Sequence, residues 1–297
     1  MKWQGVWTAL ATPMDGEALD LGAFERLAAW QVECGVHGLV VAGTTGEAPT
    51  LAADERRALL AAARRVAGGC VPVVMGVGSN STRTTLEQAA AAADGGADAL
   101  LVVVPYYNKP TQEGLLRHFT AVLDAARLPV LAYNVPGRTA CDLLPATLAR
   151  LVDHPRFAGI KEATGNLERA LEVGTLLRDG QALLSGDDGT FLPFLACGGH
   201  GVISVASNVA PREMVALYAA WAGGRPAEAL GWARRLAPLC KALFAETNPG
   251  PVKAALVLLG RAREGIRSPL AWPSAATRDR LRAALDGLGL LPAGGVG

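Results

Sequence analysis

The sequence predicts an α/β protein, a (β/α)8 TIM barrel with a C-terminal helical domain. Short apolar runs, typical of buried strands, alternate eight times with longer amphipathic stretches typical of helices. The runs are apolar throughout, as in parallel strands that are covered on both faces. Eight strand–helix units favour a closed barrel over an open doubly wound sheet. A Rossmann-like sheet, the alternative, would need Gly-x-Gly-x-x-Gly directly after a strand, and no such motif stands there.

The strands are predicted from their shortness and their content of Val, Leu, Ile and Ala, bounded by turn residues. They cover residues 6–9, 38–42, 71–76, 99–104, 130–133, 157–161, 182–185 and 201–205. Each is followed by a helix or a turn, so the chain returns to the same end of the barrel before the next strand begins.

The helices between them are predicted from apolar periodicity and end signals. They cover residues 21–33, 54–67, 81–93, 112–126, 145–151, 167–177 and 190–196. Asp54 and Glu55 place negative charge in the first turn of the second helix. Ser81 and Thr84 are equally good N-caps for the third, Thr84 as part of a capping box with Glu87.

More than ninety residues follow the eighth strand, and they are predicted to be mainly helical. The helical stretches are residues 211–222, 226–246, 252–259 and 275–285, with a break at Gly223-Gly224-Arg225-Pro226. We therefore divide the chain into a barrel catalytic domain, residues 1–224, and a C-terminal helical domain, residues 225–297, which we interpret as a packing or assembly element.

Composition excludes several classes of function. The chain has 297 residues, a net charge of +1 and 5% aromatic residues, which argues against nucleic-acid binding. The start lacks the apolar core of a signal peptide, and alanine-rich stretches such as residues 89–93 are too short to span a membrane, so a cytoplasmic protein is expected. The five cysteines are odd in number and widely spaced, which predicts buried free thiols and neither a metal site nor disulfides.

Lys161 is the strongest candidate for chemistry. The chain has only five lysines, and this one closes the apolar run of residues 157–160, while the others lie at the terminus, in a turn or in helical stretches. A lysine at the carboxyl end of a buried strand is poorly hydrated, which disfavours the ammonium form and leaves an amine that can attack a carbonyl group. An isolated lysine is more often a solvated charge, so the neighbouring residues decide between the two interpretations.

Polar residues follow five of the other predicted strands, and in a barrel of parallel strands they meet on one rim. Tyr133 could itself be a core residue, and Arg138 a surface charge. Together with Lys161, however, these segments form one hydroxyl-rich set: residues 43–47, 105–108, 133–139, 185–188 and 203–204.

This set suggests a Schiff-base mechanism on a 2-oxo acid. Lys161 would attack the keto carbon, and the protonated imine would ease loss of a proton from the adjacent carbon. Tyr133 is the natural proton carrier, with Thr44 and a second tyrosine as a relay. Backbone N–H groups of residues 43–46 can bind the substrate carboxylate, and Arg138 can hold a second, anionic substrate.

The motifs resemble the dihydrodipicolinate synthase family of pyruvate-dependent class I aldolase-like lyases, from about Gly5 to Leu291. The matching segments are Gly43-Thr44-Thr45-Gly46-Glu47, Pro105-Tyr106-Tyr107-Asn108, Tyr133-Asn134-Val135-Pro136-Gly137-Arg138-Thr139, Gly159-Ile160-Lys161-Glu162-Ala163-Thr164-Gly165-Asn166, Ser185-Gly186-Asp187-Asp188 and Gly199-His200-Gly201-Val202-Ile203-Ser204.

The resemblance implies condensation of pyruvate with L-aspartate-4-semialdehyde in lysine and diaminopimelate biosynthesis, with no cofactor beyond the covalent Schiff base. It implies a homotetramer, a dimer of dimers, in which Tyr107 reaches into the relay of a neighbouring subunit. The site residues that it implies are Lys161, Tyr133, Thr44 and Tyr107 for catalysis, and Thr45, Arg138, Gly186 and Ile203 for binding substrate.

Inhibition by lysine is expected to be weak or absent. The resemblance implies an effector site at a subunit interface, and Asn80 and Tyr106 of that site are kept. Inhibited relatives tend to carry serine, histidine and glutamate at other positions of the site, where this chain has Ala48, Pro49, Ala53, Arg56 and Thr84. An arginine that faces a lysine ammonium repels it.

Three other functions stay open. A retro-aldolase for sialic acid or 3-deoxy-2-keto sugar acids would share Lys161 and Tyr133, although such enzymes look unlike this chain at residues 133–139. A pyridoxal-phosphate enzyme would use Lys161 for its cofactor. A non-catalytic 2-oxo acid binding protein would keep the fold without forming a covalent adduct.

Overall fold

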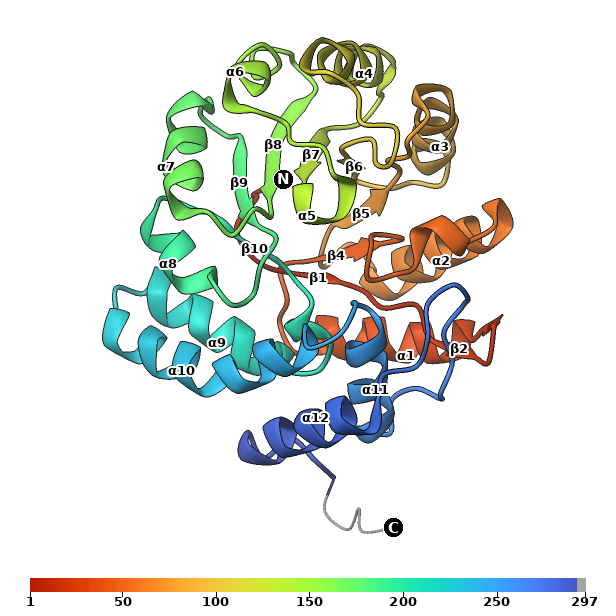
Figure 1. Cartoon of the computed structure of the whole chain (residues 1–297), viewed down its shortest axis with the longest axis vertical. Coiled ribbons are helices and arrows are strands. Elements are labelled where there is room, and N and C mark those ends of the chain that lie inside the picture. Colours follow the sequence, from red (N-terminus) through yellow and green to blue (C-terminus); the bar gives the residue numbers. More distant parts are fainter. Residues whose placement is uncertain (293–297) are drawn as a thin grey trace.

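Eight parallel strands form a closed barrel in the computed structural model, which describes residues 1–292 (Figure 1). Around the barrel the order is β1-β10-β9-β8-β7-β6-β5-β4, and β1 closes the ring by pairing with both β10 and β4. The predicted (β/α)8 barrel is therefore confirmed, and every predicted strand is present to within two residues. The barrel strands are β1 (Gly5–Ala9), β4 (Gly38–Val41), β5 (Val73–Gly76), β6 (Ala99–Val103), β7 (Val130–Asn134), β8 (Phe157–Glu162), β9 (Ala182–Ser185) and β10 (Gly201–Ser204).

Helices cover the outside of the barrel, and all of the predicted ones are present. They are α1 (Leu21–Glu33), α2 (Ala53–Ala67), α3 (Thr82–Asp94), α4 (Gln112–Ala125), α6 (Pro145–Leu148), α7 (Leu167–Leu176) and α8 (Phe191–Ala196). Of the two candidate caps of α3, Ser81 is the one used, because its side chain accepts a hydrogen bond from the Thr84 amide. α6 is shorter than predicted and ends at Leu148.

Four short elements were not predicted. They are the β2–β3 hairpin (Met14–Asp15 and Ala18–Leu19), the 3₁₀ turns η1 (Ala48–Thr50) and η2 (Ala206–Asn208), and the one-turn helix α5 (Pro136–Thr139). Segments this short carry no periodicity that a sequence pattern could reveal. α5 follows β7 almost directly and η1 follows the loop after β4, so both shape the rim where the polar residues gather.

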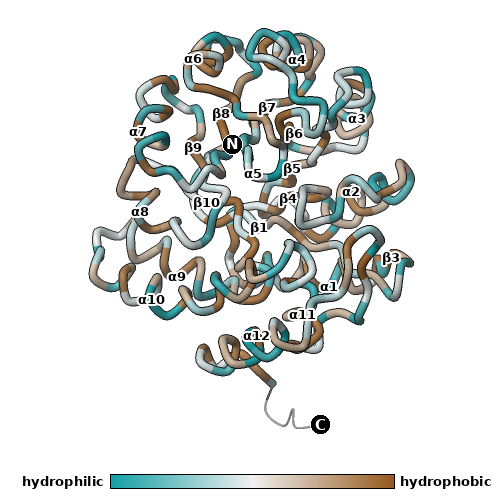
Figure 2. Tube along the Cα trace, viewed as in Figure 1, coloured by the Kyte–Doolittle hydropathy of each residue, from teal (hydrophilic) through white to brown (hydrophobic). Residues whose placement is uncertain are grey.

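Two apolar layers stabilise the barrel. The inner layer fills its interior with side chains that include Trp7, Leu101, Leu184 and Ile203. Gly38 makes room for Trp7, since a Cβ atom at Gly38 would lie 2.1 Å from the indole ring. The outer layer packs the strands against the helices. In Figure 2 brown and teal segments alternate along these helices, as in helices that bury one face.

The chain continues after the eighth strand as helices that lie beside the barrel, the first two of them next to α8 (Figure 1). They are α9 (Pro211–Ala222), α10 (Pro226–Leu243), α11 (Gly250–Leu258) and α12 (Ala275–Gly287). α10 packs along α9, and α12 packs against α10 and α11. The boundary predicted at residue 224 falls between α9 and α10 and stays a prediction. Among residues 1–292, no helix combines the length and apolarity needed to cross a membrane.

The cysteines are free thiols, as predicted, but they are not all buried. Cys34, Cys141 and Cys240 are buried, whereas Cys197 is partly exposed and Cys70 is exposed. The expectation of burial is wrong for Cys70 because it lies in the turn after α2, outside the helix–strand layer.

Candidate active site

The carboxyl ends of the strands surround a cavity of about 340 Å³. This end is where the loops of a (β/α)8 barrel place functional groups. Four strands or the loops that follow them contribute the residues that the argument uses, and Asn248 comes from the C-terminal part of the chain. The residues that the argument uses are Thr44, Thr45, Tyr133, Arg138, Lys161, Gly186 and Asn248.

Lys161 and Tyr133 lie side by side on neighbouring strands. β7 and β8 are in register at these two residues, so their side chains point the same way. Each side chain is 6% exposed, and Lys161 Nζ lies 4.1 Å from the centre of the Tyr133 ring. Within residues 1–292, no carboxylate oxygen lies within 4.0 Å of Lys161 Nζ. The amine is therefore held by a barrel strand, shielded from water and free of an ion pair.

The loop of residues 43–47 offers two free backbone donors to this cavity. The amides of Gly46, Glu47 and Ala48 donate within the loop, to the carbonyl oxygens of Gly43 and Thr44. The amides of Thr44 and Thr45 have no hydrogen-bond partner in the described part of the chain. Successive unpaired N–H groups of this kind bind anions. Thr44 and Thr45 also line the cavity, so a substrate carboxylate can be bound here.

Arg138 and Asn248 stand at the cavity edge. Arg138 is exposed and belongs to α5, and its Nη2 donates to the Asn248 carbonyl oxygen at 3.3 Å. The Asn248 side chain is buried and donates through Nδ2 to Thr45 Oγ1 at 3.0 Å. The exposed guanidinium keeps free donors for a second carboxylate.

Gly186 is required where it stands because Lys161 occupies the space next to it. A Cβ atom on Gly186 would lie 2.9 Å from Lys161 Cε and 2.5 Å from Ala163 Cβ. Real Cβ atoms do not approach other atoms that closely, so any larger residue would push the lysine away from the cavity.

Four predicted site residues lie outside this cavity in the single chain, and one of them, Tyr106, lines the second cavity described below. Tyr107 is 86% exposed and projects outward from a loop in which its φ angle is +74°. Ile203 is buried in the inner barrel layer, beneath the cavity rather than on its surface. Asn80 contacts Asn108, whose Nδ2 donates to the Asn80 carbonyl oxygen at 2.8 Å.

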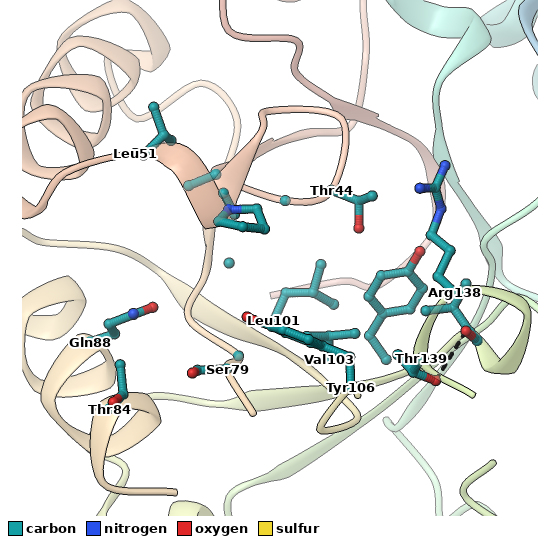
Figure 3. A pocket seen from close by; sticks show the side chains of 18 of the residues that line it. Thr44, Leu51, Ser79, Thr84, Gln88, Leu101, Val103, Tyr106, Arg138 and Thr139 are labelled. Carbon is teal, nitrogen blue, oxygen red and sulfur yellow. Dashed lines mark hydrogen bonds between the residues drawn. The ribbon is translucent and has the colours of Figure 1, made fainter. Parts of the chain in front are cut away.

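A second cavity of about 430 Å³ adjoins the first and shares Thr44, Tyr133 and Arg138 with it. Figure 3 shows Thr44 and Arg138 at one end, and Thr84 and Gln88 at the other. Tyr106 and Arg56 also line it, and among its lining residues there is no aspartate or glutamate.

Arg56 brings to this second cavity a positive charge that pairs with no carboxylate of residues 1–292. Its guanidinium donates to the carbonyl oxygens of Ala48 and Gly76 and to Gln88 Oε1, all neutral acceptors. Burial lowers the pKa of this guanidinium from its ordinary value, but an arginine remains charged at neutral pH.

Glu162 follows Lys161 in sequence but faces the opposite side of β8. Its carboxylate accepts hydrogen bonds from Asn134 Nδ2 at 3.2 Å and from the Thr164 amide at 2.8 Å. Asn134 Nδ2 also donates to Asp142, which pairs with Arg169 at 3.2 Å. This network fixes the strand end that carries Lys161 without contacting the amine.

Burial raises the pKa of Glu162, and this predicts a pH-dependent stability difference. Above the ordinary glutamate pKa of about 4.3, the folded protein keeps a proton here that the unfolded chain has lost, so stability falls as pH rises through this window. Glu162→Gln removes that loss. We expect the melting temperature of the variant, relative to the wild type, to increase from pH 4 towards neutrality.

The test is how the difference in melting temperature between Glu162→Gln and the wild type changes with pH. The size of that difference at any single pH is not the test. The new glutamine amide donor faces Asn134 Nδ2, which is also a donor, and this lowers the stability of the variant by the same amount at every pH. A difference in melting temperature that stays constant or decreases with rising pH contradicts the prediction.

Sequence reasoning missed Asn248, Asp187 and Phe244 as cavity residues. Asp187 lies in a segment that was singled out, but it was given no role. Asn248 and Phe244 lie between α10 and α11, far along the chain from every barrel strand. The polar break Thr247-Asn248-Pro249-Gly250 marks a loop there, but nothing local in it points to the barrel rim.

Comparisons with known proteins agree over nearly the whole chain. The model of the dihydrodipicolinate synthetase family matches residues 2–288. A 4-hydroxy-tetrahydrodipicolinate synthase from an Anaeromyxobacter species is 51% identical over 290 residues, covering 97% of this chain and 98% of the relative.

Solved structures give the same result. The dihydrodipicolinate synthase of Thermotoga maritima superposes with a TM-score of 0.96 at 44% identity, covering 98% of this chain and all of that one. The enzyme of Acinetobacter baumannii, solved in complex with pyruvate, gives 0.95 at 41% identity, covering 97% of this chain and all of that one. With this identity, coverage and fold, the chain belongs to the dihydrodipicolinate synthetase family.

Proposed function

We propose that this chain condenses pyruvate with L-aspartate-4-semialdehyde to give 4-hydroxy-tetrahydrodipicolinate, in lysine and diaminopimelate biosynthesis. The observation that carries the proposal is the pair of Lys161 and Tyr133, with Nζ 4.1 Å from the ring centre, beside two unpaired amides. A 2-oxo acid needs such an arrangement, with a nucleophilic amine for its keto carbon and donors for its carboxylate.

The first half of the reaction joins pyruvate to the enzyme. The Lys161 amine adds to the keto carbon, and one water molecule leaves as the imine forms. The protonated imine withdraws electrons, so a proton leaves the methyl group and an enamine results. Tyr133, through its hydroxyl, is proposed to carry these protons, with Thr44 in the relay. The covalent partner is the substrate itself, so the reaction requires no cofactor.

The second half forms the product. The enamine carbon attacks the aldehyde of the semialdehyde, and its carbonyl oxygen takes a proton to become the 4-hydroxyl group. The semialdehyde amine then displaces Lys161 from the imine carbon, which closes the ring and regenerates the free lysine. Arg138 is proposed to hold the semialdehyde carboxylate, because its donors face the cavity from the rim.

The outward position of Tyr107 supports an assembly in which it completes another subunit's relay. A tyrosine that is 86% exposed contributes nothing to its own chain's cavity. We propose that it enters the site of a neighbouring copy in a homotetramer, a dimer of dimers, in the cytoplasm. Equilibrium sedimentation of the wild type, together with Tyr107→Phe kinetics, tests this assignment.

Product analysis separates the proposed activity from its alternatives. We expect mass spectrometry to detect the cyclic product from pyruvate and L-aspartate-4-semialdehyde. Release of pyruvate from sialic acid or a 3-deoxy-2-keto sugar acid at a higher kcat/KM would instead identify a retro-aldolase. A protein that binds pyruvate but yields no borohydride adduct is non-catalytic, and a purified protein with pyridoxal absorbance uses a different chemistry.

Gly186→Ala is expected to lower kcat/KM by about 100-fold, the cost of a catalytic group displaced by about 1 Å. The added methyl group overlaps Lys161 Cε and Ala163, as described above. Steady-state kinetics with both substrates measure the effect.

Gly189→Ala is the matched control for Gly186→Ala. It lies three residues further along the same loop, and a Cβ atom there meets only the Asp187 carboxylate oxygens, at an ordinary 3.6 and 3.8 Å. Equal activity in the two variants would show that crowding of Lys161 does not matter.

Lysine is expected to inhibit weakly or not at all. Of the positions that depart from inhibited relatives, Ala48, Pro49, Arg56 and Thr84 line the second cavity. A cavity with a partly buried guanidinium and no carboxylate in its lining disfavours an ammonium ligand. Titration of L-lysine in the steady-state assay measures this, and half-inhibition at micromolar lysine contradicts the prediction.

A further inference from the structure

The rim loop of residues 43–47 adopts a costly backbone conformation. Ala42, just before it, and Glu47, its last residue, have φ angles of +51° and +56°. These angles lie in the left-handed region, which is unfavourable for residues other than glycine and persists only where the surroundings enforce it. Something outside the loop must therefore hold it.

The C-terminal segment supplies the contacts that hold the end of the loop. Glu47 Oε1 accepts from Lys253 Nζ of α11, and Glu47 Oε2 accepts from the Arg267 amide at 3.0 Å. Two residues earlier, Thr45 Oγ1 accepts from Asn248 Nδ2 at 3.0 Å. Between them, the Gly46 carbonyl oxygen accepts from Thr12 Oγ1 at 2.8 Å. Three successive loop residues are thus fixed, two of them by residues 248–267.

The Glu47–Lys253 ion pair is fully enclosed. Glu47 is 2% exposed and Lys253 is 1% exposed. Burial lowers the pKa of the Lys253 ammonium, and the Glu47 carboxylate opposes that shift. A buried ion pair adds little net stability compared with apolar residues of the same size, because both charges lose their hydration. Its clearest consequence is geometric, since both oxygens of Glu47 must stay where their donors are.

The fixed position of the Glu47 carboxylate affects the backbone donors of the active site. The unpaired amides of Thr44 and Thr45 lie within three residues of Glu47, inside the short loop that Glu47 terminates. We propose that Glu47 and Lys253 are positioning residues: their ion pair lets the C-terminal helices hold the Thr44 and Thr45 amides in the orientation that binds the substrate carboxylate. This inference rests on the proposed function and adds a role for α11 in substrate affinity.

The ion pair is tested with three variants: Lys253→Met, Glu47→Gln and the double variant. Each single variant leaves one buried charge without its partner, a carboxylate in Lys253→Met and an ammonium in Glu47→Gln, and risks a failure to fold. The double variant removes both charges, and its glutamine can still accept from the Arg267 amide. The measurement is the rate of borohydride trapping at Lys161 as a function of pyruvate concentration, alongside steady-state kcat and KM.

We expect the double variant to fold and to require about tenfold more pyruvate for half-maximal trapping, the factor for one weakened hydrogen bond to a charged group. The trapping rate at saturating pyruvate and kcat should change much less, because the amine and Tyr133 are untouched. A purely structural ion pair would change the melting temperature and leave the pyruvate dependence unaltered.

Arg263→Ala is the control. Arg263 pairs with Asp15 on the surface and also joins the C-terminal segment to the barrel side, but it does not contact the rim loop. Arg263→Ala should reach half-maximal borohydride trapping at the same pyruvate concentration as the wild type. If the folded double variant also needs the same pyruvate concentration as the wild type, the positioning role is wrong while the proposed function still stands. If the wild type itself yields no pyruvate adduct, the proposed function fails as well.

Discussion

Lys161→Met is expected to abolish turnover, lowering kcat by about 10⁴-fold or more, as for removal of a covalent nucleophile. Methionine has nearly the same length as lysine and no amine. The position is 6% exposed, and burying a thioether there costs less than burying an ammonium. The variant should therefore fold, and its loss of activity should be chemical.

Steady-state kinetics and thermal unfolding of Lys161→Met, side by side, check this expectation. Lys241→Met is the matched control, because Lys241 is exposed on α10 and does not line the cavity. A Lys161→Met variant that keeps more than about 1% of the wild-type kcat would contradict a covalent role, since such a role leaves far less.

Tyr133→Phe is expected to lower kcat by about 10²- to 10³-fold, the usual contribution of a positioned acid–base group. The change removes only the hydroxyl group. The ring, which packs 4.1 Å from Lys161 Nζ and belongs to the inner barrel layer, stays in place. The lysine should therefore still form an adduct with pyruvate, but proton transfers should limit each turnover.

The Tyr133→Phe measurement pairs kcat with borohydride trapping. Tyr218→Phe serves as control, because Tyr218 lies on α9 against His37, away from the cavity. A Tyr133→Phe variant with wild-type kcat would exclude the hydroxyl group as a proton carrier. A variant that is inactive because it does not fold would be recognised by its unfolding curve.

The barrel could be predicted because its strands are buried on both faces and its helices on one. Continuous apolar runs such as residues 99–103 and periodic ones such as residues 21–33 identify these two environments directly. The approximate meeting of Lys161 with Tyr133 also follows from topology, since consecutive parallel strands end at the same rim. Their shared register and the 4.1 Å approach required the structure.

The contribution of the C-terminal helices could not be predicted from sequence. Asn248 and Lys253 reach the rim loop across about 200 residues of chain, and neither belongs to a pattern that specifies a distant partner. The φ angles of Ala42 and Glu47 are likewise imposed by tertiary contacts, because neither residue type favours them. The proposed use of Tyr107 by another copy depends on an assembly that one chain does not contain.

Borohydride reduction in the presence of pyruvate, followed by peptide mass mapping, tests the central claim most directly. The account predicts one modified peptide, carrying the mass of reduced pyruvate on Lys161, and no such adduct in Lys161→Met. An adduct on another lysine, or none in the wild-type protein at saturating pyruvate, would contradict it.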